Sequence, residues 1–226
     1  MSRSKMSSLV LSVLMAACLS TSAFANSGEL LNFHGLGDLS PVGNFYNGGG
    51  LADTPNYGVS FSSNFFGLRS FANGGSGNFS GTLTGVPAIF INGTLGSAVT
   101  GTMNVAPGFS TGLNFYYTAG FASNQFLTLK VWSGSNGTGT VLATIVLANN
   151  NGSCTAPAYC MWSDAGVTFS GTAHSVTFTG PANEFGLSNL TLGSSQTAVP
   201  EPSTILLLNT GAVGVFACWR RRLFRS

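Results

Sequence analysis

Charged side chains are scarce in this sequence of 226 residues: Asp, Glu, Lys and Arg together make up 6% of it, against about a quarter in ordinary soluble proteins. This scarcity excludes an intrinsically disordered chain, because disorder couples low hydrophobicity to high net charge. It also disfavours a helical fold, since surface helices need Glu and Lys on their solvent face. We expect the surface to consist of Ser, Thr, Asn and Gly, in strands and turns.

Clusters of basic residues are missing from the central part of the chain. Six of the eight Lys and Arg residues stand in the first five or the last seven positions. Residues 26–196 hold two bases and five acids, a net charge of −3. A nucleic-acid surface needs grouped Lys and Arg to neutralise phosphates. We therefore expect no nucleic-acid partner.

Recognisable catalytic motifs are absent as well. The sequence has no G-x-S-x-G turn for a serine nucleophile, and no Lys or helical pattern follows its glycine-rich stretches, which excludes a phosphate-binding loop. Sugar hydrolysis usually needs two carboxylates. Five acids are available: Glu29, Asp38, Asp53, Asp164 and Glu184. No motif pairs them, so we expect no catalytic residue and rank a glycoside hydrolase last among the alternatives.

The N-terminal region has the layout of a secretory signal peptide. A basic start precedes an apolar core over residues 9–19, and the small-residue sequence AFA follows at Ala23–Ala25. This order predicts a signal peptide over residues 1–25, cleaved by signal peptidase. The apolar core is shorter than a membrane span. Lipidation at Cys18 and a buried N-terminal helix are the alternatives.

The C-terminal region, VPEPSTILLLNTGAVGVFACWRRRLFRS, has three parts. A linker over residues 194–203 contains Pro-Glu-Pro, whose prolines favour extended backbone. Residues 204–219 carry no charge and predict a single membrane-spanning helix, although a short one. Residues 220–226 are basic, which predicts a cytoplasmic tail. The alternatives are a plain single-span anchor and a closing strand followed by a solvated tail.

This order of Pro-Glu-Pro, apolar segment and terminal arginines resembles the PEP-CTERM sorting signal. The resemblance implies a membrane-embedded exosortase-type processing enzyme as partner. Recognition would fall on the motif itself: Pro200, Glu201 and Pro202. Transfer across the inner membrane would stop at three arginines: Arg220, Arg221 and Arg222. The resemblance further implies a Gram-negative bacterium that makes exopolysaccharide, with the protein delivered to its cell surface or extracellular matrix.

Residues 26–193 show short apolar or alternating runs, separated by clusters of Gly, Asn and Ser. Nine runs are predicted strands: 57–61, 87–91, 101–105, 111–118, 125–132, 140–148, 166–171, 174–180 and 184–192. Asn-Gly pairs between them favour tight hairpin turns. So many short strands predict an all-β fold, an antiparallel, jelly-roll-like β-sandwich. Within 125–132, alternation assigns Leu127, Leu129 and Val131 to the core, and Lys130 and Trp132 to the wetter face.

Two cysteines stand within this predicted domain, Cys154 and Cys160, in the stretch CTAPAYC. In an exported protein, such a pair predicts a disulfide. A zinc site is the alternative, but it would need further ligands, and the only histidines are the distant His34 and His174. The disulfide would shape a loop between two strands.

Aromatic side chains among hydroxyls and amides are typical of sugar-binding surfaces, because the rings stack on apolar sugar faces. The candidates are Tyr46, Tyr57, Trp132, Tyr159 and Trp162. Tyr159 and Trp162 are favoured because they flank Cys160, and a disulfide there would hold them rigid.

Carboxylates near the first and last strands form one further constellation. Glu29 and Asp38 lie near the first strands and Glu184 precedes the last. A calcium ion could tie these strands together, but Ser188 stands where an acid would help. We assign no metal ligand and expect no other cofactor. We predict a secreted, non-enzymatic surface or matrix protein associated with exopolysaccharide or biofilm, with a carbohydrate-binding module as the alternative.

Overall fold

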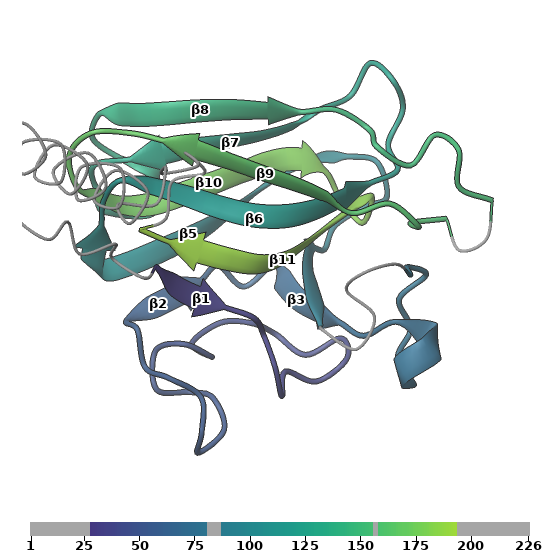
Figure 1. Ribbon diagram of the computed structural model, residues 1–226, viewed down its shortest axis with the longest axis horizontal. Coiled ribbons are helices and arrows are strands. Elements are labelled where there is room, and N and C mark those ends of the chain that lie inside the picture. Colours follow the sequence, from purple (N-terminus) through teal and green to yellow (C-terminus); the bar gives the residue numbers. More distant parts are fainter. Residues whose placement is uncertain (1–27, 81–86, 156–157, 194–226) are drawn as a thin grey trace, which may run out of the picture.

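The computed structural model describes residues 28–80, 87–155 and 158–193, and Figure 1 shows their strands arranged as two layers. One sheet has the order β3-β4-β11-β6-β9, with β1 also paired to β11. Its strands are β1 (Glu29–Leu31), β3 (Phe65–Leu68), β4 (Ala88–Ile91), β6 (Gly112–Ala119), β9 (Ser163–Thr168) and β11 (Phe185–Leu192).

The other sheet has the order β2-β5-β10-β7-β8. Its strands are β2 (Val59–Phe61), β5 (Ala98–Phe109), β7 (Leu127–Trp132), β8 (Val141–Leu147) and β10 (Ala173–Pro181). All strand pairs in both sheets are antiparallel. Two short 3-10 helices, η1 (Phe71–Asn73) and η2 (Ser135–Gly137), lie in connections. The prediction of an all-β antiparallel sandwich is confirmed.

Each of the nine predicted strands overlaps an observed one. The strand predicted over 166–171 is observed at Ser163–Thr168, three residues earlier. The sequence reading missed β1 and β3. β1 has only three residues, and β3 reads as an apolar run without alternation, so neither carries the two-residue period of a half-buried strand.

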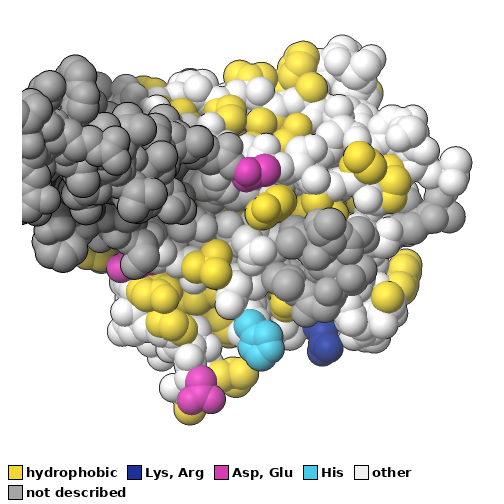
Figure 2. All heavy atoms as spheres, in the orientation of Figure 1, with side chains coloured by type: hydrophobic (Ala, Val, Ile, Leu, Met, Phe, Trp, Pro, Cys, Tyr) yellow, Lys and Arg dark blue, Asp and Glu magenta, His cyan; other side chains and the backbone are white. Residues whose placement is uncertain are grey.

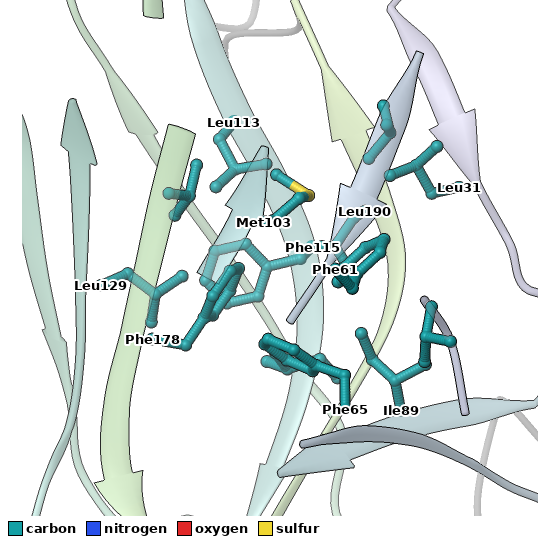
Figure 3. Close-up of a cluster of buried hydrophobic side chains, with 14 of the residues drawn as sticks. Leu31, Phe61, Phe65, Ile89, Met103, Leu113, Phe115, Leu129, Phe178 and Leu190 are labelled. Carbon is teal, nitrogen blue, oxygen red and sulfur yellow. The ribbon is translucent and has the colours of Figure 1, made fainter. Parts of the chain in front are cut away.

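The hydrophobic core fills the space between the two sheets (Figure 3). Its labelled side chains come from both layers: Leu31, Phe61, Phe65, Ile89, Met103, Leu113, Phe115, Leu129, Phe178 and Leu190. Leu127, Leu129 and Val131 are fully buried in it, while Lys130 is exposed, as the alternation within β7 predicts. At about 25 cal/mol per Å² of apolar surface removed from water, these rings and aliphatic chains supply the main stabilisation of the sandwich.

Phenylalanine packing in this core depends on one glycine. Phe65 meets Phe61 and Phe178 edge to face, with ring centroids 5.2 and 5.6 Å apart. A Cβ at Gly101, on β5, would collide with the Phe65 ring. The missing side chain at position 101 therefore lets a ring from one sheet reach the inner face of the other.

The surface has the character that the composition predicts. In the view of Figure 2, charged side chains of the described residues are few and isolated, and hydrophobic side chains lie in small separate groups. Hydroxyl and amide groups supply much of the polar surface. On the outward side of the five-stranded sheet, for example, the hydroxyls of Thr100 and Thr179 lie 2.8 Å apart across β5 and β10.

The first and last strands of the sandwich are neighbours. β1 pairs with β11, and Glu29 lies opposite Leu192. The start and the end of the described domain therefore lie side by side at one end of the six-stranded sheet.

Several predictions fall outside the described residues. These are the signal peptide (1–25), the linker (194–203), the membrane span (204–219) and the basic tail (220–226). Within the described ranges, no helix combines the length and hydrophobicity that crossing a membrane requires.

Candidate functional site

A pocket with a cavity volume of about 280 Å³ opens on the outer face of the six-stranded sheet. Strand alternation turns Ile89 on β4 into the core, so its neighbours Ala88 and Phe90 point outwards to the pocket. Leu68 lies opposite Ala88 on β3. On the central strands, Gly186 and Thr118 form a pair and complete the floor. Because Ala88 has only a methyl group and Gly186 has no side chain, the cavity remains open between the larger side chains.

Two chain segments rise from this floor as walls. One is 76–79, which contributes Phe79; the other contributes Tyr159 and Trp162. The Phe79 and Trp162 rings meet edge to face at 5.5 Å, and the indole N–H of Trp162 donates to the Ser80 carbonyl at 2.9 Å. Four aromatic rings, counting Phe90 on the floor, thus border one cavity.

Backbone hydrogen bonds fasten the two walls to each other. The N–H of Ser80 donates to the Tyr159 carbonyl at 2.9 Å, and the N–H of Tyr159 donates to the Asn78 carbonyl at 3.2 Å. Phe79 and Tyr159 form a parallel β-bridge. Tyr159 is therefore held by its main chain, independently of where its ring points.

A disulfide joins Cys154 to Cys160, the residue that follows Tyr159, with a Cα–Cα distance of 5.7 Å. This pairing confirms the prediction and leaves neither sulfur free to bind zinc. The bridge closes a ring that contains Tyr159 and ends two residues before Trp162.

Asn151 anchors this disulfide loop to the sheet. Its side chain is 5% exposed. It donates to the Thr118 hydroxyl at 2.7 Å and to the Ala119 carbonyl at 3.0 Å, both at the end of β6. Its carbonyl oxygen accepts from the N–H of Met161 at 2.8 Å. One buried amide thus ties the segment between Tyr159 and Trp162 to the pocket floor.

Asp38 holds the opposite wall. Its carboxylate accepts from the N–H of Arg69 at 2.7 Å, from the N–H of Ser76 at 3.0 Å and from the Ser76 hydroxyl at 2.7 Å. Partial burial alone would raise the pKa of Asp38, but these hydrogen bonds and the Arg69 charge outweigh it and hold the pKa below 3.8. The ionised carboxylate fixes the loop that contributes Ser76 to the pocket.

Tyr159 keeps its phenolic proton at neutral pH. Burial raises the pKa of its hydroxyl, and the negative charge of Glu184 raises it further. A Cβ at Gly120 would come within 2.9 Å of the Tyr159 ring, so the glycine leaves room for it. Glu184 itself has one buried carboxylate oxygen without a hydrogen-bond partner among the described residues.

Comparison of the sequence with protein families concerns the C-terminal region, downstream of the pocket residues. The family model for the PEP-CTERM protein-sorting motif matches residues 198–222. The chain carries a PEP-CTERM sorting motif. The motif implies processing by an exosortase-type enzyme, and it indicates export and cell-surface sorting in bacteria. No curated protein matches the sequence.

The sandwich upstream of the PEP-CTERM motif has distant likenesses among solved structures. The K2 cleaved adhesin domain of Lys-gingipain is 13% identical, with a TM-score of 0.42 over 66% of this chain and 96% of that one. CsCBM6-3 from Clostridium stercorarium, in complex with cellobiose, is 17% identical, with a TM-score of 0.36 over 60% of this chain and 87% of that one. A family 11 carbohydrate-binding module from Clostridium thermocellum is 12% identical, with a TM-score of 0.32 over 64% of this chain and 92% of that one. Likenesses this distant say nothing about what the sandwich upstream of the motif binds.

The structure separates the predicted aromatic candidates. Tyr159 and Trp162 share the pocket, whereas Trp132 ends β7 in the other sheet, where its indole N–H donates to the Thr177 hydroxyl at 2.9 Å. The prediction that Tyr46 contributes to a binding surface was wrong, because Tyr46 is 2% exposed and belongs to the core. Burial raises its pKa to about 12. Tyr57 stacks on Tyr46 at 6.0 Å and packs against the core as well.

The three carboxylates that were considered as possible calcium ligands lie apart. Glu29 lies on β1, Asp38 binds the loop around Ser76, and Glu184 lies beside Tyr159. In the described part of the chain, no three His, Cys, Asp or Glu side chains come together as metal ligands could.

Sequence reasoning missed most of the pocket lining. Phe90 had a signal, because it alternates with the core residues Ile89 and Ile91 and therefore points outwards. Phe79, Asn78 and the outward-pointing floor residues had none, since they lie in irregular loops or at ordinary strand positions. Only the fold brings them beside Trp162.

Proposed function

We propose that this chain is an exported, non-enzymatic protein of the bacterial cell surface or extracellular matrix, and that its sandwich binds exopolysaccharide in the pocket around Trp162. The observation that carries the binding proposal is the grouping of Phe79, Phe90, Tyr159 and Trp162 around one cavity. Aromatic rings offer flat apolar surfaces that match the apolar faces of sugar rings.

Rigidity supports this proposal. Backbone hydrogen bonds join the two aromatic walls, and the disulfide and the buried Asn151 hold the wall of Tyr159 and Trp162 in place. A site whose side chains are already fixed loses little conformational entropy when a ligand binds. The disulfide Cys154–Cys160 thus lies beside the place where the rings gather.

The chemistry of the lining supports a binding role rather than hydrolysis. No described residue that lines the pocket carries a carboxylate, and hydrolysis of sugars usually requires two. Glu184, whose charge acts on Tyr159, is not among the described lining residues, and one of its carboxylate oxygens is fully buried.

The test is polysaccharide binding by the full-length chain on an array of bacterial exopolysaccharides and their oligosaccharides. We expect Trp162→Ala and Tyr159→Ala each to weaken binding about tenfold or more, since a tenfold loss corresponds to about 1.4 kcal/mol. Phe126→Ala is the matched control, because Phe126 is an exposed aromatic residue, 47% accessible, outside the pocket. Absence of binding to every glycan, or equal binding by all three variants, would contradict the proposal.

The hydrolase alternative is tested in the same incubations by measuring new reducing ends. We expect none. Release of sugar by the unmodified chain that disappears in Glu184→Gln would show catalysis and contradict the non-enzymatic assignment.

A further inference from the structure

The polar groups of the pocket are largely occupied by the protein itself. The Ser76 hydroxyl donates to Asp38, and the buried Thr118 hydroxyl accepts from Asn151. The side-chain nitrogen of Asn183 donates to a backbone carbonyl at 2.6 Å. These hydrogen bonds stabilise the walls, and they leave Ser76 only as an acceptor and Thr118 as a donor toward a ligand.

Three polar groups of the described lining are wholly unoccupied: the side-chain nitrogen of Asn78, the side-chain oxygen of Asn183 and the hydroxyl of Tyr159. None of them makes a hydrogen bond within the described part of the chain. The Asn78 nitrogen can donate, the Asn183 oxygen can accept, and the Tyr159 hydroxyl can do both. The pocket can thus satisfy only a few hydroxyl groups of a sugar.

Most of the other described lining side chains are apolar. Leu39, Leu68 and Ala88 contribute only hydrocarbon, and Phe79 and Phe90 add two rings without polar atoms. A hydroxyl group pressed against these side chains would lose its water without gaining a partner, which is unfavourable. A methyl group in the same place would gain from leaving water.

The volume limits what can enter. At about 280 Å³, the cavity lies just below the range of roughly 300–1,000 Å³ usual for small-molecule sites. A pocket of this size suits a terminal or branching sugar residue rather than a long stretch of polymer.

We propose that the pocket selects a sugar residue that carries a methyl group, as in a 6-deoxyhexose or an acetylated hexose, over the corresponding plain hexose. This inference rests on the proposed function and names its ligand class. The aromatic rings and the three free polar groups hold the sugar ring, and the methyl group contacts Leu39, Leu68 and Ala88.

The experiment compares sugars that differ at one position. Binding of L-rhamnose is compared with L-mannose, L-fucose with L-galactose, and N-acetylglucosamine with glucose. Affinities come from NMR titration of the full-length chain with the free sugars. We expect the methyl-bearing member of each pair to bind about tenfold tighter, and Trp162→Ala to abolish binding of both members.

Two variants test the apolar contact itself. Leu39→Ser places a hydroxyl group at a residue that is 54% exposed, so the fold is not at risk, and Ala88→Ser does so on the floor. We expect either change to reduce the preference to about threefold or less. Equal binding within every pair, still abolished by Trp162→Ala, would overturn the methyl preference and leave the sugar site standing. Binding of no sugar at all would overturn the proposed function with it.

Discussion

At the scale of single residues, two polar side chains hold the walls of the pocket. Asp38 binds the loop that carries Ser76, and Asn151 binds the segment between Tyr159 and Trp162. Neither residue offers a ring to a ligand. Both act by fixing backbone groups, and a hydrogen bond to an ionised group is about twice as strong as a neutral one.

We expect Asp38→Asn to lower the free energy of unfolding by about 1 to 2 kcal/mol at pH 7, because the amide accepts fewer of the three hydrogen bonds and solvent screens this partly exposed site. The folded-state pKa of Asp38 lies below its ordinary value. Its contribution is therefore complete above about pH 4. It disappears as the pH falls through the folded-state pKa.

Urea unfolding at pH 7 and at about pH 2 checks this dependence on protonation. The difference between the unmodified chain and Asp38→Asn should be smaller at the lower pH. Asp53→Asn is the control, since Asp53 is exposed and should change stability little at either pH. A destabilisation by Asp38→Asn that is equal at both pH values would show that the carboxylate's charge is not what holds the loop.

At the scale of elements, alternation along the strands decides which side chains reach the core and which reach the pocket. The same rule that buries Leu129 and exposes Lys130 on β7 turns Ile89 inwards and Phe90 outwards on β4. This period of two is visible in the sequence, so the sandwich and much of its core could be predicted.

Pairing between strands could not be predicted in the same way, because it depends on contacts between distant segments. Nothing local says that Gly186 lies opposite Thr118, or that segment 76–79 meets Tyr159. The proximity of Tyr159 and Trp162 was predictable from Cys160 beside them. Tyr46 misled because its Gly-rich surroundings suggested an exposed loop, whereas its hydroxyl accepts from the buried Phe33 N–H at 2.6 Å.

The asparagine run at 149–151 shows how a turn signal can hide a structural role. The sequence predicts only a turn there. In the structure, Asn150 accepts from the N–H of Ala119 at 2.8 Å, and Asn151 contacts the same end of β6. Side-chain amides thus supply hydrogen bonds that a further strand would otherwise give to β6.

Replacing both disulfide cysteines, as Cys154→Ser with Cys160→Ser, should lower the free energy of unfolding by about 2 kcal/mol, because a small ring constrains the unfolded chain only modestly. We also expect polysaccharide affinity to fall about three- to tenfold, since Tyr159 lies within the ring. Urea unfolding and glycan titration measure the two effects. Reduction of the unmodified chain should reproduce both. An unchanged affinity would show that Asn151 and the bonds to 78–80 hold Tyr159 without the bridge.

At the scale of the whole molecule, the pocket and the last described residues of the domain lie toward opposite ends of β11. β11 borders the pocket at Gly186, its second residue, and ends at Leu192, opposite Glu29. Six residues of strand separate the two positions by about 20 Å, at roughly 3.3 Å per residue. The described domain thus continues into its PEP-CTERM tail at the end of β11 that is remote from the pocket.

We therefore expect sorting and binding to be separable. Deleting Pro200–Pro202 should leave the chain unprocessed in the inner membrane, because the motif matched at residues 198–222 is interrupted, while polysaccharide affinity stays unchanged. Deleting residues 194–196, outside the matched range, is the control of equal length and should allow normal processing. Cell fractionation, the mass of the product and glycan binding by isolated membranes measure both properties. Release of the motif-deleted chain at the control's rate would contradict sorting by this motif, and loss of binding would show that the tail contributes to the pocket.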